Sequence, residues 1–215
     1  MLVLAIDSAT PTLVLGLVRN QELLAQKLFD EPRRHNEVLV PAVQVLLEDQ
    51  GLSFADLDGV VVGCGPGPFT GLRVGMVSAM AFADALNLPI DGVSTHQAMA
   101  HGVEGEVLVL SDARRKEVYF TLIRNGEVID GPGVCKPAEL PFDSASKLIV
   151  PEHLIEQLPG SLRGAQHMPS ALGARSLVAV ADFSAPQPPE PLYLRRPDAK
   201  EPVVRISPAL VHPAS

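Results

Sequence analysis

The feature that most restricts the fold of this chain is an internal repeat with an offset of 105 residues. Residues 2–7, Leu-Val-Leu-Ala-Ile-Asp, align with residues 107–112, Val-Leu-Val-Leu-Ser-Asp. The match continues without a gap, and the turn Arg19-Asn20 recurs as Arg124-Asn125. Both copies predict a strand, an Asp-containing turn, a strand, an Arg-Asn turn and a third strand. We therefore expect an α/β fold made of two duplicated halves.

Helical patterns follow the three strands of the first copy. The spacing of apolar residues predicts two helices that are apolar on nearly every side, one over 36–50 and one running from the glycine loop 65–71 to about Leu86. In the second copy prolines interrupt the pattern, so this half is degenerate. The shorter expected helices cover 94–101, 152–158 and 170–181.

The domain organisation follows from the repeat. We expect a first half at 1–102, completed by part of the C-terminal segment, and a second, degenerate half at 103–195. Residues 196–215 are rich in proline and are expected to form an extended tail.

Composition narrows the class of protein. With 47% hydrophobic and 20% charged residues, a chain of 215 residues can bury a sizeable core. A net charge of -8 argues against a chain that binds nucleic acid by itself, without a basic partner. Cys64 and Cys135 lack CxxC spacing, so we expect no zinc site, no disulfide framework and a cytoplasmic location. The apolar tract 74–83 is shorter than the ~18 residues that cross a bilayer, which predicts no membrane association.

Two strand-end acids are candidates for a nucleotide site. Asp7 is followed by Ser8, and Asp112 occupies the same place in the second copy. Acids at the carboxyl ends of strands could face phosphates or their magnesium ion across a cleft. Each Asp could equally cap its own turn through the backbone.

The glycine loop is the second nucleotide candidate. Gly65 and Gly67 permit positive φ angles, and Thr70 opens a helix whose first turn could bind an anion. The loop lacks the Lys of a P-loop. The alternative is a loop that only fixes how a strand and a helix pack.

The two apolar helices predict a subunit interface. The second helix carries a row of small residues at every fourth position, on which another helix could approach closely. Because a chain of this length has few layers in which to hide two such helices, we expect them to meet a partner. The expected interface residues are Val38, Leu39, Ala42, Val43, Leu46, Gly71, Gly75, Ser78, Ala79 and Ala83.

Together these motifs resemble the bacterial TsaB (YeaZ) family. The resemblance rests on Asp7-Ser8, the 34–37 stretch Arg-His-Asn-Glu, the glycine loop continuing to Gly75, the 112–119 stretch Asp-Ala-Arg-Arg-Lys-Glu-Val-Tyr, and the 193–195 stretch Tyr-Leu-Arg. It implies an actin-like, sugar-kinase-like fold of two ribonuclease-H-like halves. It also implies a role in making N6-threonylcarbamoyladenosine (t6A) at position 37 of tRNA.

The resemblance implies a subunit that is not an enzyme by itself. The family pairs with a catalytic paralogue, TsaD, which holds a metal through a His-x-x-x-His pair. Here Thr95 and Met99 fall at those positions, so this chain is expected to have no metal site and no catalytic residues. Pro68 and Met80 depart from residues common in the family, namely Ser and Lys.

The leading hypothesis is an assembly subunit that binds TsaD, works with the ATPase TsaE, and meets tRNA only through the complex. Alone it is expected to form a homodimer. It requires no cofactor, with ATP or ADP and Mg as weak ligands at most. The alternative is an actin-like ATPase or kinase that uses Asp7, the 65–71 loop and Asp112. A peptidase would need a metal, or a nucleophile and base, that the sequence does not display.

Overall fold

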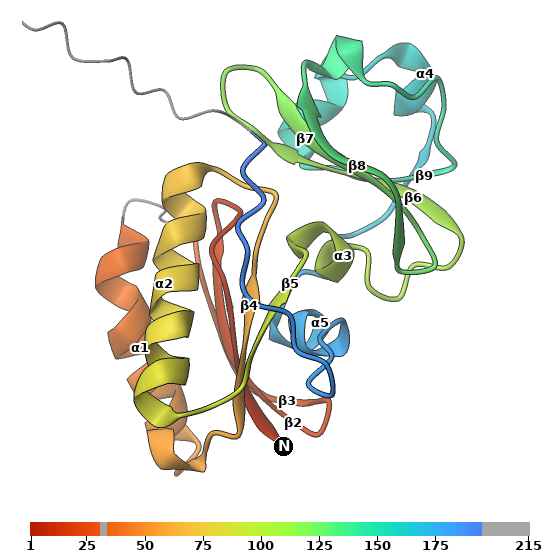
Figure 1. The fold of residues 1–215 in the computed structure, drawn as a ribbon. Coiled ribbons are helices and arrows are strands. Elements are labelled where there is room, and N and C mark those ends of the chain that lie inside the picture. Colours follow the sequence, from red (N-terminus) through yellow and green to blue (C-terminus); the bar gives the residue numbers. More distant parts are fainter. Residues whose placement is uncertain (31–33, 195–215) are drawn as a thin grey trace, which may run out of the picture.

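The chain folds into two lobes, one around each of two five-stranded sheets (Figure 1). Figure 1 draws a computed structural model, which describes residues 1–30 and 34–194. The first lobe holds β1 (Leu2–Asp7), β2 (Leu13–Arg19), β3 (Glu22–Phe29), α1 (His35–Asp49), the 3-10 turn η2 (Phe54–Asp56), β4 (Gly59–Gly63), α2 (Phe69–Leu86) and β5 (Ile90–Val93). The helix α3 (Thr95–Met99) leads into the second lobe, which contains β6 (Glu106–Asp112), β7 (Val118–Arg124), β8 (Glu127–Cys135), η3 (Pro137–Glu139), β9 (Lys147–Ile149), η4 (Glu152–Gln157), α4 (Gly160–Arg163) and β10 (Gln166–His167). The last helix, α5, spans Ala174–Ala179.

Both sheets have the same topology. The first sheet has the order β3-β2-β1-β4-β5, and the second has the order β8-β7-β6-β9-β10. In each sheet the first three strands are antiparallel, and the first strand is parallel to the fourth. The predicted α/β fold with two duplicated, ribonuclease-H-like halves is therefore confirmed. The second half is reduced, because η3 stands where the first half has α1, and η4 with the four-residue helix α4 stands where it has α2.

The ungapped repeat is nevertheless one residue out of register in its first strand. Asp7 pairs with Val14 in the first sheet, and Ser111 pairs with Tyr119 in the second. Val14 and Tyr119 are themselves 105 residues apart, so the structural counterpart of Asp7 is Ser111 and not Asp112. Between these equivalent pairs the second half has seven intervening residues, 112–118, where the first half has six, 8–13.

The cores lead to the same conclusion. Leu4 and Ile6 face the core under α1 and α2, and Leu108 and Leu110 face the equivalent outer core of the second half. These pairs are 104 residues apart. Because side chains alternate along a strand, a shift of one residue would have moved all of them to the opposite face.

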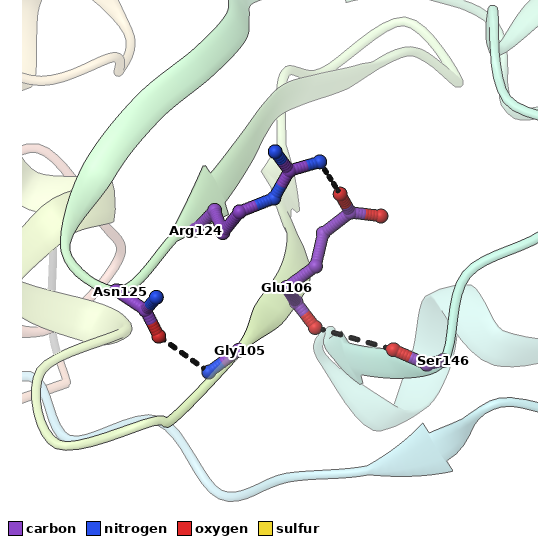
Figure 2. Close-up of polar contacts among 5 residues, drawn as sticks. All are labelled: Gly105, Glu106, Arg124, Asn125 and Ser146. Atoms are coloured by element: carbon purple, nitrogen blue, oxygen red, sulfur yellow. Dashed lines mark hydrogen bonds and ion pairs between the residues drawn. The ribbon is translucent and has the colours of Figure 1, made fainter.

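The same correspondence holds at the opposite end of β6, which Figure 2 shows for the second half. There the Gly105 amide donates a hydrogen bond of 2.7 Å to Asn125 Oδ1, beside an ion pair of 2.8 Å between Arg124 and Glu106. Ser146 donates to the Glu106 carbonyl, which ties the start of β6 to the segment before β9. In the first half the Met1 amino group donates to Asn20 Oδ1 over 2.6 Å. The two asparagines thus close equivalent turns in the two halves.

Helix α3 lies between the lobes and contacts both β6 and α5, whereas α5 packs on strands β1, β2, β3 and β4 of the first sheet (Figure 1). Ala174, Leu177 and Val178 of α5 cover the inner face of the first sheet, although they follow the second sheet in sequence. Met99 of α3 joins the inner core of the second sheet. The two halves are therefore interlocked through exchanged helices.

The helix predictions are close at the long helices and poorer at the short ones. Helix α1 encloses Pro41, and α2 ends at Leu86 as expected. The segment expected as a helix at 152–158 is a 3-10 turn, and the helix expected at 170–181 is shortened to Ala174–Ala179. Three prolines within 151–169 limit helix growth there, because proline lacks the backbone donor.

Residues 182–194 form an extended strap that returns to the first lobe, seen as the blue segment along β4 and β5 in Figure 1. The carboxylate of Asp91 accepts hydrogen bonds from the amides of Asp182 and Gln187, at 2.8 and 2.6 Å. Further along, the Leu192 amide donates to the Cys64 carbonyl over 2.9 Å. Arg195 and the predicted tail at 196–215 lie outside the described residues.

Helix α2 extends on both sides of the apolar tract 74–83. It contains 18 residues with few charges, and within the described part of the chain it alone is long and apolar enough to cross a bilayer. Core helices of soluble proteins meet the same criterion. One side of α2 packs on β1 and β4.

Candidate functional site

The end of β1 is enclosed by glycines. A Cβ atom at Gly63 would overlap the Asp7 carboxylate, and one at Gly67 would overlap the Ala9 backbone. Gly65 has a φ of +98°, a conformation that glycine adopts without strain. The contact at Gly67 favours the packing role of the loop, since this glycine lets the loop approach the turn that follows β1.

The row of small residues on α2 serves the same purpose. Ser8 donates to the Gly71 carbonyl over 2.7 Å and accepts from the Gly75 amide over 2.9 Å. A Cβ atom at Gly75 would overlap Ser8 Oγ, and Ala79 is fully buried against the chain's own core. The expectation that this row faces a partner is therefore wrong, because the row allows β1 and α2 to approach each other.

The same correction applies to most of the predicted interface. Seven of its ten residues are buried in the chain's own structure, namely Leu39, Ala42, Val43, Leu46, Gly75, Ala79 and Ala83. Val38, Gly71 and Ser78 are half-buried. Both helices need to cover one sheet, and this need accounts for the apolar positions that the sequence pattern assigned to a partner.

Asp7 is completely buried and does not face a cleft. Its Oδ2 accepts a hydrogen bond of 2.6 Å from Thr95, and its Oδ1 accepts one of 2.8 Å from the Ala9 amide. Burial raises the pKa of Asp7 to about 6, although both hydrogen bonds act in the opposite direction. In this structure Asp7 caps its turn and anchors the start of α3.

A cavity of about 580 Å³ lies between the two halves and brings together three of the six predicted nucleotide residues. Ser8 and Thr70 line it from the first half, and Asp112 lines it from the second. Arg114 and His35 also contribute to its wall. Asp7, Gly65 and Gly67 are buried and do not line this cavity.

Asp112 is engaged in its own turn and with a neighbouring histidine. Its Oδ1 accepts a hydrogen bond of 2.6 Å from the Arg114 amide, and its Oδ2 lies 3.2 Å from His153 Nε2. The turn carries three consecutive residues with positive φ, Arg114, Arg115 and Lys116. The backbone-capping interpretation of both acids thus agrees with their hydrogen bonds.

Helix α3 connects the strand ends of the two halves through adjacent side chains. Thr95 bonds Asp7 in the first half, while His96 lies 2.8 Å from both Ser111 and Thr121 in the second. Burial lowers the pKa of His96 to about 3, so its imidazole is neutral at physiological pH. The sequence pattern gave no signal for the two hydroxyl partners of His96.

The two positions where the resemblance places a metal pair are packed by the chain itself. Thr95 donates to Asp7 and accepts from the Gly65 amide, and Met99 is buried in the inner core of the second half. Throughout residues 1–30 and 34–194, no three His, Cys, Asp or Glu side chains are close enough together to hold a metal ion.

The outer faces of α1 and α2 expose apolar side chains that the sequence analysis did not select. Val77 is 60% exposed and Val40 is 50% exposed, and Met80 is 43% exposed at a position already noted as a departure from the family. We call Val40, Val45, Val77 and Met80 the outer apolar face. Exposed apolar groups gathered on two adjacent helices are typical of protein interaction surfaces.

An aromatic cluster lies at the start of α2, where the strap ends. The ring of Tyr193 packs against Phe69 in a tilted arrangement with ring centroids 4.8 Å apart, and the Arg73 guanidinium lies 3.9 Å from the centre of the Phe69 ring. Arg73 also donates to the Tyr193 hydroxyl over 3.1 Å. The strap therefore places a C-terminal residue beside the exposed side of α2.

Comparison with known proteins identifies the class. A family model for TsaD, described as tRNA N6-adenosine threonylcarbamoyltransferase, matches residues 22–184, and the chain belongs to this family. A Pseudomonas aeruginosa structure, described as an uncharacterized protein with similarity to peptidase YeaZ, is similar with a TM-score of 0.73 and 27% identity. The similarity covers 90% of this chain and 99% of that one.

Two sequence relatives narrow the class further. An uncharacterized protein of Mycobacterium tuberculosis is 44% identical over 92% of this chain and 93% of its own length. Escherichia coli TsaB, a tRNA threonylcarbamoyladenosine biosynthesis protein, is 37% identical over 59% of this chain and 57% of its own length. Within its family the chain is thus a TsaB/YeaZ-type protein.

Proposed function

We propose that this chain is a non-catalytic subunit of the t6A biosynthesis system, and that it binds the catalytic paralogue TsaD through the outer apolar face. The TsaB name of its relatives supports a role in t6A biosynthesis. In this proposal TsaE completes the assembly, tRNA is met only through the complex, and the chain alone forms a homodimer. No cofactor is required, and the chain works in the cytoplasm.

The observation that carries the proposal is the exposure of apolar groups on two adjacent helices. Val77 and Met80 lie on α2 one turn apart, and Val40 and Val45 lie on α1. Their burial against a partner would contribute roughly 25 cal/mol for each Å² of apolar surface removed from water. A paralogue with the same fold presents equivalent helices, so one face can serve both for TsaD and for a second copy.

The non-catalytic role is supported by the use of α3. Thr95 is committed to Asp7 and Gly65, and His96 is committed to two hydroxyls. A metal or a general base at this helix would require these groups to give up buried hydrogen bonds.

The test is capture of TsaD by matched variants. Val77→Glu places a charge on the outer apolar face at a position where the native side chain is 60% exposed, so the variant should fold. We expect capture to fall at least tenfold. Ile129→Glu, on β8 and 46% exposed, is the matched control and should bind normally. Equal capture of both variants and of the parent would rule out this face.

The cavity between the halves supports a second candidate, a nucleotide-binding ATPase or kinase. It places Ser8 and Thr70 opposite Asp112 in about 580 Å³. Calorimetry with ATP and Mg tests this candidate directly. Binding that is lost in Asp112→Asn, together with ATP hydrolysis by the pure chain, would favour it over the assembly role.

A further inference from the structure

Helix α3 connects the two halves, and different side chains along it contact different halves. Thr95 and Ala98 of α3 are three residues apart and face the first half, where Ala98 packs with Val61 and Val93. His96 and Met99 have the same spacing and face the second half. Residues three apart lie on the same face of a helix. One face of the short helix α3 therefore contacts the first half, and another face contacts the second half.

We propose that Thr95 and His96 form a two-sided latch that fixes the angle between the halves. The latch joins equivalent places in the repeat, because Asp7 and Ser111 occupy the same position at the ends of β1 and β6. It thereby sets the width of the cavity that Ser8 and Thr70 share with Asp112. The inference does not depend on whether TsaD or a nucleotide binds.

On the side of the latch that faces the second half, His96 requires two particular hydrogen-bond partners. The imidazole is fully buried and lies 2.8 Å from the hydroxyls of Thr121 and Ser111. A neutral imidazole donates from one ring nitrogen and accepts at the other, and a hydroxyl can serve either role. Rotation of the halves would separate these groups and leave buried polar atoms without partners, which is costly.

The first side of the latch has an equally closed set of partners. Thr95 Oγ1 donates to Asp7 and accepts from the Gly65 amide at 3.1 Å. Gly63, at the end of β4, leaves room for the Asp7 carboxylate. The latch is therefore bonded to β1 and the glycine loop in the first half and to β6 and β7 in the second.

The experiment measures the distance between spin labels on the two halves of the full chain. Labels are attached at Asp84→Cys on α2 and Glu156→Cys on η4, both exposed, in a Cys135→Ser background. The parent is expected to give one narrow distance distribution. Thr121→Val, which removes one hydroxyl partner of His96, should widen it at least twofold, whereas Thr121→Ser, which keeps the hydroxyl, should restore the parent width.

A control separates a latch from a general loss of stability. Leu162→Ala, on α4, creates a cavity in the outer core of the second half, on the face of the second sheet opposite Met99 of α3, and should lower the Tm without widening the distribution. If Thr121→Val does not fold, Ser111→Ala is interpreted in the same way. A broad distribution in the parent, or a folded Thr121→Val variant with the parent width, would overturn the proposal.

Discussion

The hydroxyl of Thr95 donates a hydrogen bond of 2.6 Å to Asp7, and both residues are completely buried. The pKa of Asp7 is raised from 3.8 to about 6, chiefly because burial disfavours the charged carboxylate. The folded state therefore holds its proton more tightly than the unfolded chain does. The contribution of this carboxyl to the free energy of unfolding is therefore fully present below about pH 4 and is lost as the pH rises through 6.

Asp7→Asn should remove this dependence. The difference in unfolding free energy between parent and variant should fall by roughly 2 kcal/mol between pH 4 and pH 7, because one pKa unit corresponds to 1.36 kcal/mol and the unfolded carboxyl is already partly ionised at pH 4. Denaturant titrations at several pH values measure it. His96 acts in the opposite direction, because its lowered pKa costs stability as the pH falls below 6.5. Comparing parent with variant cancels that contribution, and a constant difference would contradict the assignment.

The contact between Ser8 and Gly75 predicts a strong coupling. Gly75→Ala places a methyl group on Ser8 Oγ and should destabilise the chain by roughly 1–3 kcal/mol. In the Ser8→Gly background the same change should cost less, because the obstructing side chain is gone. A double-mutant cycle by chemical denaturation measures the coupling. Additive effects would show that the close approach of β1 and α2 is not limiting.

Ala79 and Ala81 on α2 differ in environment and supply a matched pair. Ala79 is fully buried against the sheet, whereas Ala81 is exposed. Ala79→Arg should unfold the chain or lower its Tm by more than 10 °C, since an unpaired charge would enter the core. Ala81→Arg should leave the Tm nearly unchanged. Thermal melting of both variants tests whether Ala79 lies in the chain's own core. A stable Ala79→Arg chain would restore the small-residue row as a partner face.

The strap packs beside Cys64 and should therefore limit the reactivity of its thiol. The thiol is buried, and its pKa is raised to about 12, mainly by burial and secondly by the negative charge of Asp7. Asp91→Ala removes the carboxylate that holds the strap at Asp182 and Gln187. Alkylation of Cys64 should then accelerate at least tenfold in a Cys135→Ser background, as followed by mass spectrometry. An unchanged rate would mean that Asp91 does not hold the strap over Cys64.

The sequence predicted the elements with strong periodicity. The repeat indicated two similar sheets, and the long apolar patterns located α1 and α2 to within a residue or two. It could not show a one-residue insertion, because Asp112 offers the same side chain as Asp7 one position later than its structural counterpart, Ser111. Only strand pairing reveals that difference.

The candidate site was harder to predict for a physical reason. A helix that is apolar all round does not show which face meets its own sheet, so the pattern selected Ala79 and left out Val77. The partners of His96 are 15 and 25 residues away along the chain, and only the pairing of β6 with β7 brings them together. The pairing of Tyr193 with Arg73 spans 120 residues and has no local signal.

The position of α5 has a consequence for synthesis on the ribosome. Val3 and Ala5 belong to the first strand that is made, yet Ala174 and Leu177 cover them only after most of the chain has been translated. The inner face of the first sheet therefore remains open while the second half emerges. Folding should be completed late and cooperatively, and a nascent chain stalled before residue 174 should expose this face to chaperones.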